Sequence, residues 1–311
     1  MPAKRVVVGI DGSENSDLAL TWAAREALLR GLPLEVVLAW DASWMTSSEG
    51  IMAIMDVDEA FTRLGALAAT HVDESVARLE ARADVPGLEQ LEIIRTPVRG
   101  PVVPTVITAA DGAAELVVGR RGTGRLGRLF MGSVSAGIVR QAHLPVTIIP
   151  DPGRAEVQRT AALDGAERDD TPRVVVGVDG SAPAAQALRF AAEVARLRDL
   201  PLHVVACWQL ATTGPLPETF GWAPPLDDYT AHTGDLLERS IVDSGISVPD
   251  DRLVRHVVRA SPGRGLLRAA AGASQLVLGS RGLGGFERLM LGSVSSQLIE
   301  HAPCPVTVVR S

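Results

Sequence analysis

Several features typical of secreted or membrane proteins are absent from the sequence. It has two cysteines, Cys207 and Cys304, and no C-x-x-C motif, so it offers no disulfide framework and no zinc site of the usual spacing. No apolar run approaches the roughly eighteen residues of a membrane span. The first strand-like run reaches Asp11 too soon for a signal peptide. These absences favour a protein of the reducing cytoplasm without a membrane span.

Positive charge and paired histidines are scarce as well. The chain of 311 residues carries 30 Lys and Arg against 37 Asp and Glu, a formal net charge of −7. A general nucleic-acid binder needs a basic face to contact phosphates, so this class is disfavoured. The six histidines form neither H-x-x-x-H nor H-x-G-H, so we expect no metal centre and no adenylyl-transfer chemistry. Small molecules and other proteins remain as partners.

What the sequence does contain is an internal repeat. The run from Arg5 to Trp40 returns from Arg173 to Trp208, an offset of 173 − 5 = 168 residues. The run from Gly119 to Pro150 returns from Gly279 to Arg310, at 279 − 119 = 160 residues. The second copy therefore lacks a net 168 − 160 = 8 residues in its middle. A repeat on this scale predicts two domains of one fold.

Within each copy, short apolar runs alternate with helical patterns. The strand-like runs of the first copy are 5–10, 34–40, 91–95, 115–119 and 145–149. Strand–helix alternation predicts a parallel sheet with helices on both faces, joined by right-handed crossovers. We predict an α/β protein of two tandem doubly wound domains, each a five-stranded parallel sheet. The domains are residues 1–150 and 172–311, and the charged, Ala- and Gly-rich segment 151–171 is a linker.

The first helix carries recognisable start and stop signals. Asn15 or Ser16 is expected to cap its N-terminus, and Gly31 to end it before Pro33. Its apolar side is expected to comprise Leu18, Trp22, Ala23 and Leu29. The remaining helices are expected at about 58–82, after Pro101 and over 133–142.

Two lookalike phosphate motifs overlap in the first copy. "GTGRLG" (122–127) matches the dinucleotide fingerprint G-x-G-x-x-G, but the second copy has Glu287 where the third glycine, Gly127, stands. The hexamer also follows the fourth strand, whereas the fingerprint belongs to the turn after the first strand. "GRLFMGSV" has P-loop spacing with Ser133 in place of the lysine. Comparison of the copies therefore disfavours both the dehydrogenase and the P-loop interpretation.

A longer pattern survives in both copies: two glycines separated by two residues, then nine residues, then Gly-Ser-Val-Ser. Together with Asp-Gly-Ser after the first strand, it resembles the universal stress protein family in its ATP-binding branch. The resemblance covers both copies, with no departure from the motif. It implies a sheet order of 3-2-1-4-5 and one ATP site per domain, with Mg²⁺ left open as a companion ion.

The resemblance also implies roles for individual residues. Asp11 and Asp179 would hold the adenosine end, and Ala39 and Ala206 would border the adenine. The implied nucleotide-binding residues of the first copy are Gly9, Asp11, Ala39, Gly119, Arg120, Arg121, Gly122, Thr123, Gly124, Gly132, Ser133, Val134 and Ser135. Those of the second copy are Gly177, Asp179, Ala206, Gly279, Ser280, Arg281, Gly282, Leu283, Gly284, Gly292, Ser293, Val294 and Ser295.

General physical chemistry supports a site at this place. Neighbouring first and fourth strands would open a crevice at their carboxyl ends, where Asp11 and Gly119 both lie. Glycines allow close approach of the backbone to phosphate and positive φ, and the helix starting at Ser133 offers N–H groups to an anion. The recurring pairs Arg121/Arg281 and Arg128/Arg288 could contact either phosphate or surface acids. The bland alternative makes the glycines and Asp11 turn residues and Ser133 an ordinary cap.

Two functional classes remain open. The resemblance implies an ATP-binding regulatory protein of the stress response, in which bound nucleotide controls conformation or the choice of an unidentified protein partner. The alternative is a weak ATP hydrolase or phosphotransferase. The sequence has no P-loop lysine in either copy and no carboxylate or histidine placed beside Ser133 to orient water or a substrate hydroxyl. It therefore favours a regulatory protein without catalytic residues.

Assembly and the inserts give two further expectations. The runs 145–149 and 305–309 would end their domains as edge strands. Universal stress protein domains pair through this region, so the resemblance implies a pseudo-twofold dimer of the two domains, and leaves a homodimer of whole chains open. Apolar residues in the two inserts predict either a lid over the crevice or ordinary loop packing. They are Trp44, Met45, Met52, Met55, Phe220 and Trp222.

Overall fold

The structure is a computed structural model. It describes residues 4–41, 57–122, 131–151, 153, 170–209, 226–280, 282 and 291–310. Outside these ranges lie the predicted site residues Thr123, Gly124, Arg281, Leu283 and Gly284, the paired arginines Arg128 and Arg288, and the insert residues Trp44, Met45, Met52, Met55, Phe220 and Trp222. The chain divides into two compact units, Met1–Asp151 and Pro152–Ser311, each described here by itself.

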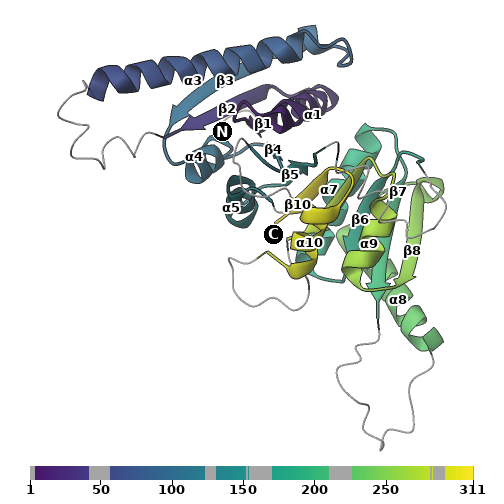
Figure 1. Cartoon of the computed structure of the whole chain (residues 1–311). Coiled ribbons are helices and arrows are strands. Elements are labelled where there is room, and N and C mark those ends of the chain that lie inside the picture. The colour runs from purple at the N-terminus through teal and green to yellow at the C-terminus, as the bar shows by residue number, and fades with distance from the viewer. Residues whose placement is uncertain are drawn as a thin grey trace, which may run out of the picture. The chain divides into compact units, whose positions relative to one another are not determined.

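The first unit alternates strands and helices along the chain (Figure 1). In order, its elements are β1 (Val6–Gly9), α1 (Glu14–Arg30), β2 (Leu34–Trp40), α3 (Val57–Glu80), the 3-10 turn η1 (Leu88–Gln90), β3 (Ile93–Arg99), α4 (Val102–Ala109), β4 (Glu115–Gly119), α5 (Ser133–Gln141) and β5 (Val146–Ile149). Neighbouring strands are parallel, in the order β3-β2-β1-β4-β5. This is the predicted sheet and the predicted order.

The second unit repeats the arrangement. Its elements are β6 (Val174–Val178), α7 (Ala182–Leu197), β7 (Leu202–Trp208), α8 (Leu226–Ser244), the 3-10 turn η2 (Asp250–Arg252), β8 (Leu253–Arg259), α9 (Pro262–Ala270), β9 (Gln275–Gly279), α10 (Ser293–His301) and β10 (Val306–Val309). Its strand order is β8-β7-β6-β9-β10, again parallel. The α/β fold class is thus confirmed for both copies, while pairing of the domains through β5 and β10 stays a prediction. Of the helices that the structure describes, none has the length and apolarity to cross a bilayer.

Alternation along β1 sends its side chains to opposite faces of the sheet. Val6 and Val8 are fully buried in the core that α1 and α3 cover. Gly9 faces the other side, where an added Cβ would lie 3.4 Å from Val106 of α4. With helices on both faces, the carboxyl ends of the central strands stay open between the two layers, where ligands of such sheets bind.

The ends of α1 differ partly from the expectation. Ser13, not Asn15 or Ser16, is the N-cap, because it is extended (φ −78°, ψ 157°) and its Oγ accepts the N–H of Ser16. Gly31 ends the helix in the left-handed conformation (φ 62°), as predicted. Leu29 is 42% exposed, so it was wrongly assigned to the buried side. Small residues form that side instead, since they let the helix approach the sheet closely: Ala19, Ala23, Ala24 and Ala27, with Leu20.

The predicted third strand was placed too early. Residues 88–90 form the turn η1, and β3 runs from Ile93 to Arg99 in register with the whole of β2. Pro97, within this run, cannot donate to a ladder. It is tolerated because β3 is the outermost strand beside β2 in this unit.

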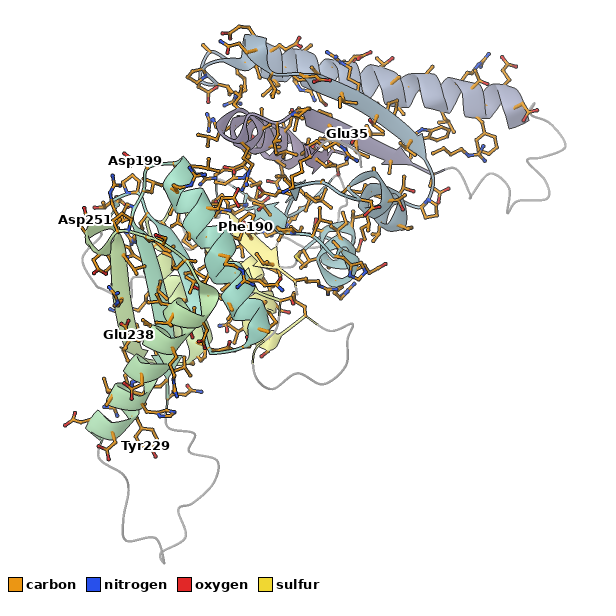
Figure 2. The ribbon with its side chains drawn as sticks, turned by 180° about the vertical axis from the view of Figure 1, so that it is seen from behind. Glu35, Phe190, Asp199, Tyr229, Glu238 and Asp251 are labelled. Carbon is orange, nitrogen blue, oxygen red and sulfur yellow. The ribbon has the colours of Figure 1, made fainter. Side chains whose placement is uncertain are left out.

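A buried polar cluster differs between the units. In the first, Arg5 donates to the carbonyl of Ala109 (2.6 Å) and pairs with Glu35, which also accepts from Thr96 (2.8 Å; Glu35 is labelled in Figure 2). In the second, His203 and His256 occupy the places of Glu35 and Thr96, at 35 + 168 and 96 + 160. His256 Nε2 and His203 Nδ1 lie 3.0 Å apart.

The imidazole of His256 predicts a pH dependence of stability. Burial, reinforced by the charge of Arg173, lowers its pKa from 6.5. Below about pH 6.5 the unfolded chain therefore binds more protons than the folded one, so the free energy of unfolding decreases as the pH falls through this range. Urea unfolding at pH 7.5 and 5.5 should show a smaller loss for His256→Thr than for the unmodified chain. The exposed His232 is the control, and an equal effect of His232→Thr would contradict the assignment.

Candidate functional site

A cavity of about 400 Å³ opens at the carboxyl ends of the central strands of the second unit. Its apolar part is lined by Val205 of β7, Leu266 of α9 and Leu278 of β9. Gly177 forms its floor, and an added Cβ there would lie 2.9 Å from Leu266 Cδ1. Glycine is needed at this position because the leucine side chain packs directly against the strand backbone. The result is an apolar slot suited to a flat, uncharged group.

The structure replaces one predicted lining residue. Ala206 is buried in the core on the opposite face of the sheet, whereas Cys207 lines the cavity. The repeat offset contained this signal, because 39 + 168 = 207 matches Ala39 with Cys207 rather than with Ala206. Burial raises the pKa of the Cys207 thiol to about 11, so the group is neutral near pH 7.

The polar end of the cavity is built by the start of α10. The lining residues there are Gly279, Gly282, Gly292, Ser293, Val294 and Ser295. Gly292 is the N-cap and provides no side-chain cap, while the first N–H groups of a helix have no intrahelical acceptor. These donors and the helix dipole favour an anion at this end.

One serine of the motif has a structural role. The Ser295 hydroxyl donates to the carbonyl of Gly279 (3.0 Å), and the N–H of Gly292 donates to the carbonyl of Ser280 (3.0 Å). These bonds tie the start of α10 to the end of β9. In the first unit Ser135 donates to Gly119 (2.7 Å) and Gly132 to Arg120 (3.0 Å), so both units hold the motif in one geometry. Ser133 and Ser293, by contrast, are exposed at the helix starts.

The motif glycines are required by close approach rather than by positive φ. None of Gly119, Gly122, Gly279 and Gly282 lies in the left-handed region, so the expectation of positive φ is wrong for them. A Cβ on Gly119 would lie 3.0 Å from the carbonyl oxygen of Asn15, and one on Gly122 would overlap the Asp11 carboxylate. Positive φ occurs instead in the turn after the first strand, at Gly12 (79°) and Gly180 (81°).

Asp11 and Asp179 connect that turn with the motif. Asp11 Oδ1 accepts from the N–H (3.1 Å) and the hydroxyl (2.6 Å) of Ser13, and Asp179 Oδ1 accepts from the N–H of Ser181 (3.0 Å). Their Oδ2 atoms face Gly122 and Gly282, respectively. The structure thus brings together the aspartates and glycines that the sequence pattern grouped. Each aspartate organises the turn through one oxygen and presents the other to the cavity edge.

The arginines of the first motif contact an acid. Asp151 Oδ2 lies 2.8 Å from Arg120 Nη2 and 3.2 Å from Arg121 Nη1. Arg120 is 1% exposed, so it was not correctly placed as a surface contact for a nucleotide. Of the two roles left open for Arg121, the structure shows the ion pair with an acid.

The cavity offers little acid–base chemistry. Among the described residues that line it, Asp179 and Cys207 carry the ionisable side chains. A search of the described part of the chain finds no group of three His, Cys, Asp or Glu side chains placed to hold a metal ion. The arrangement therefore suits binding: an apolar slot, a carboxylate at its edge and a helix N-terminus at its polar end.

Comparisons with known proteins agree with this architecture. A model of the universal stress protein family matches residues 2–150 and 171–310. A universal stress protein of Mycolicibacterium smegmatis is 31% identical over 313 residues, covering 98% of this chain and 96% of the relative. One of Mycobacterium tuberculosis is 30% identical over 308 residues, with coverage of 98% and 96%. The crystal structure of a universal stress protein from Archaeoglobus fulgidus covers 100% of this chain and 99% of its own, with a TM-score of 0.59 at 21% identity, which supports the fold. With a match of the family model to each of its two repeats, the chain belongs to the universal stress protein family.

Proposed function

We propose that this chain is a regulatory protein of the stress response that binds one ATP in each domain. The observation that carries the proposal is the cavity of the second unit, in which an apolar slot leads to an uncapped helix N-terminus. A purine fits the first chemistry, and phosphate oxygens fit the second. The matching bonds of Ser135 and Gly132 extend the proposal to the first unit.

In this proposal bound ATP controls conformation or the choice of a protein partner, and it is not turned over. The lining groups of the cavity support this view. The carboxylate of Asp179 is engaged by Ser181, and the Cys207 thiol is protonated near neutral pH. Neither group forms an acid–base pair with a second lining residue that the structure describes. Mg²⁺ would accompany ATP as a counter-ion of its phosphates.

The identity of the nucleotide can be tested directly. Protein purified without added nucleotide is denatured, and the released small molecules are identified by chromatography and mass spectrometry. Release of ATP, or of ADP formed from it, is expected. Release of a nicotinamide dinucleotide instead would contradict the proposal and revive the dehydrogenase interpretation.

The stoichiometry is a separate prediction. Because both repeats hold the complete motif, stripped protein should bind two ATP molecules per chain in isothermal titration calorimetry. Gly282→Ala should reduce the number to one, because its Cβ would overlap Asp179, which lines the cavity. A single site in the unmodified chain would show that one repeat has kept the motif without its ligand.

A further inference from the structure

An ion-pair cluster at the first motif includes a residue outside the motif. Arg120 and Arg121 stand between Gly119 and Gly122, and both lie within ion-pair distance of one oxygen of Asp151. Asp151 follows β5, where the chain leaves the first unit. The carboxylate is 23% exposed and the Arg121 side chain 22%, so both can reach a ligand at the edge of the site. Arg120, at 1%, cannot.

The second domain lacks this cluster. The positions that match Arg120 and Asp151 are 120 + 160 = 280 and 151 + 160 = 311, which are Ser280 and Ser311. The arginine that matches Arg121 is present there as Arg281. A carboxylate fixed beside the phosphate-side arginine is therefore specific to the first repeat.

We propose that Asp151 competes with nucleotide phosphate for Arg121 and thereby sets the phosphate selectivity of the first site. The inference rests on the proposed function of this site. A carboxylate and a phosphate are both oxyanions that seek the same guanidinium N–H groups. Arg120 has almost no contact with water, so it retains Asp151 as its counter-charge and keeps a negative charge next to the site.

Two consequences follow for ligands of the first site. A triphosphate must draw Arg121 away from Asp151 and accept a carboxylate as a neighbour, whereas an uncharged nucleoside does neither. Asp151 therefore weakens ATP and leaves adenosine almost unaffected. The first site then discriminates less in favour of the triphosphate than its own motif would allow.

The test uses the full chain with the second site disabled by Gly282→Ala. In this background, Arg120→Ser combined with Asp151→Ser reproduces the residues of the second domain and leaves the net charge unchanged, since one cation and one anion are removed. We expect ATP affinity to rise about fivefold to tenfold, as for release of one partly exposed charge pair, with adenosine affinity changed by less than about twofold. Isothermal titration calorimetry measures both ligands.

Two further variants protect the conclusion. Asp151→Asn alone should also raise ATP affinity, although it lowers apo stability because buried Arg120 loses its counter-charge. Asp111→Asn removes the same charge from the loop after α4, at the other end of the sheet, and should leave the ATP-to-adenosine ratio unchanged. Adding Arg121→Gln to the double serine variant should abolish its gain.

The outcomes separate this inference from the proposed function. If the unmodified chain binds neither ATP nor adenosine, the proposed function fails and the inference fails with it. If ATP binds to the first site but the ratio of ATP to adenosine affinity stays the same in both Asp151 variants, only the role of Asp151 is wrong. A gain that persists in the presence of Arg121→Gln would likewise overturn the competition for that side chain.

Discussion

Alanine at both Gly122 and Gly282 is expected to eliminate ATP binding in the micromolar to low millimolar range while leaving both domains folded. An added Cβ would overlap Asp11 Oδ2 in the first unit and Asp179 Oδ2 in the second. Each carboxylate must turn away from the cavity, and loss of one charge-assisted contact costs about tenfold to a hundredfold in affinity at each site. Neither glycine has positive φ, so alanine brings no backbone strain of the left-handed kind.

The double glycine variant is compared with a methyl group added elsewhere. Gly234→Ala places a Cβ on α8 whose nearest listed neighbour is Val257 Cγ2, at 4.0 Å, so it should change neither binding nor stability by more than about 0.5 kcal/mol. Calorimetric titration with ATP and thermal unfolding without nucleotide are measured for each chain. Normal ATP affinity in the double variant would mean that these glycines serve only the turn, and the site assignment would be wrong.

The sequence was sufficient for features that depend on local chemistry or on the repeat. Short β-branched runs predicted the strands, and Gly31 predicted the end of α1, because a left-handed cap needs little more than glycine. Comparison of the two copies separated the motif that both keep from the hexamer at Gly122–Gly127, which only one keeps. The grouping of Asp11 with Gly122 followed from parallel topology, since their strands end at the same edge.

Features that depend on three-dimensional neighbours could not be predicted in the same way. Arg120 has the same residue type as Arg121, and only the position of β5 shows that Asp151 buries one and leaves the other at the surface. The face on which Ala206 points depends on strand alternation, which a run of small apolar residues does not reveal. The extension of β3 through Pro97 depends on its place at the outer side of β2.

Packing around the sites has diverged in compensating pairs. In the first unit Val103 of α4 packs close to Gly137 of α5, and in the second Gly263 of α9 faces Gln297 of α10. The offset of 160 matches 103 with 263 and 137 with 297, so the larger side chain has moved from one helix to the other. Each helix pair can therefore stay in contact without a shared sequence, because total volume matters more than which helix supplies it.

The same exchange explains the thiol in the second cavity. A Cβ on Gly265 would overlap Cys207 Sγ, so glycine on α9 makes room for the larger residue on β7. In the first repeat the matching positions are Thr105 and Ala39, with the larger residue on the helix. The chemistry of the slot thus differs between the repeats, although the backbone pattern that forms it is the same.

Aspartate variants are expected to separate ligand binding from turn formation. Asp11→Ala with Asp179→Ala removes both carboxylate oxygens, including the Oδ1 atoms that accept from Ser13 and Ser181. We expect a loss of about 1 kcal/mol in the stability of each domain, from the missing turn bonds, together with at least about tenfold weaker ATP binding. Thermal unfolding of the apo protein and calorimetric titration measure the two effects.

Asparagine at the same positions is the matched variant. Its Oδ1 can still accept from the serine N–H, so apo stability should stay within about 0.5 kcal/mol of the unmodified chain. The charge and the acceptor that face Gly122 and Gly282 are replaced by a neutral amide, so nucleotide affinity should still fall about tenfold if the aspartates contact the ligand. Adenosine should lose as much affinity as ATP, because the aspartates lie near the apolar end of the cavity rather than at the start of α10. Full affinity in the asparagine chain combined with instability in the alanine chain would reduce Asp11 and Asp179 to turn residues and leave the recognition of the base to the apolar slot alone.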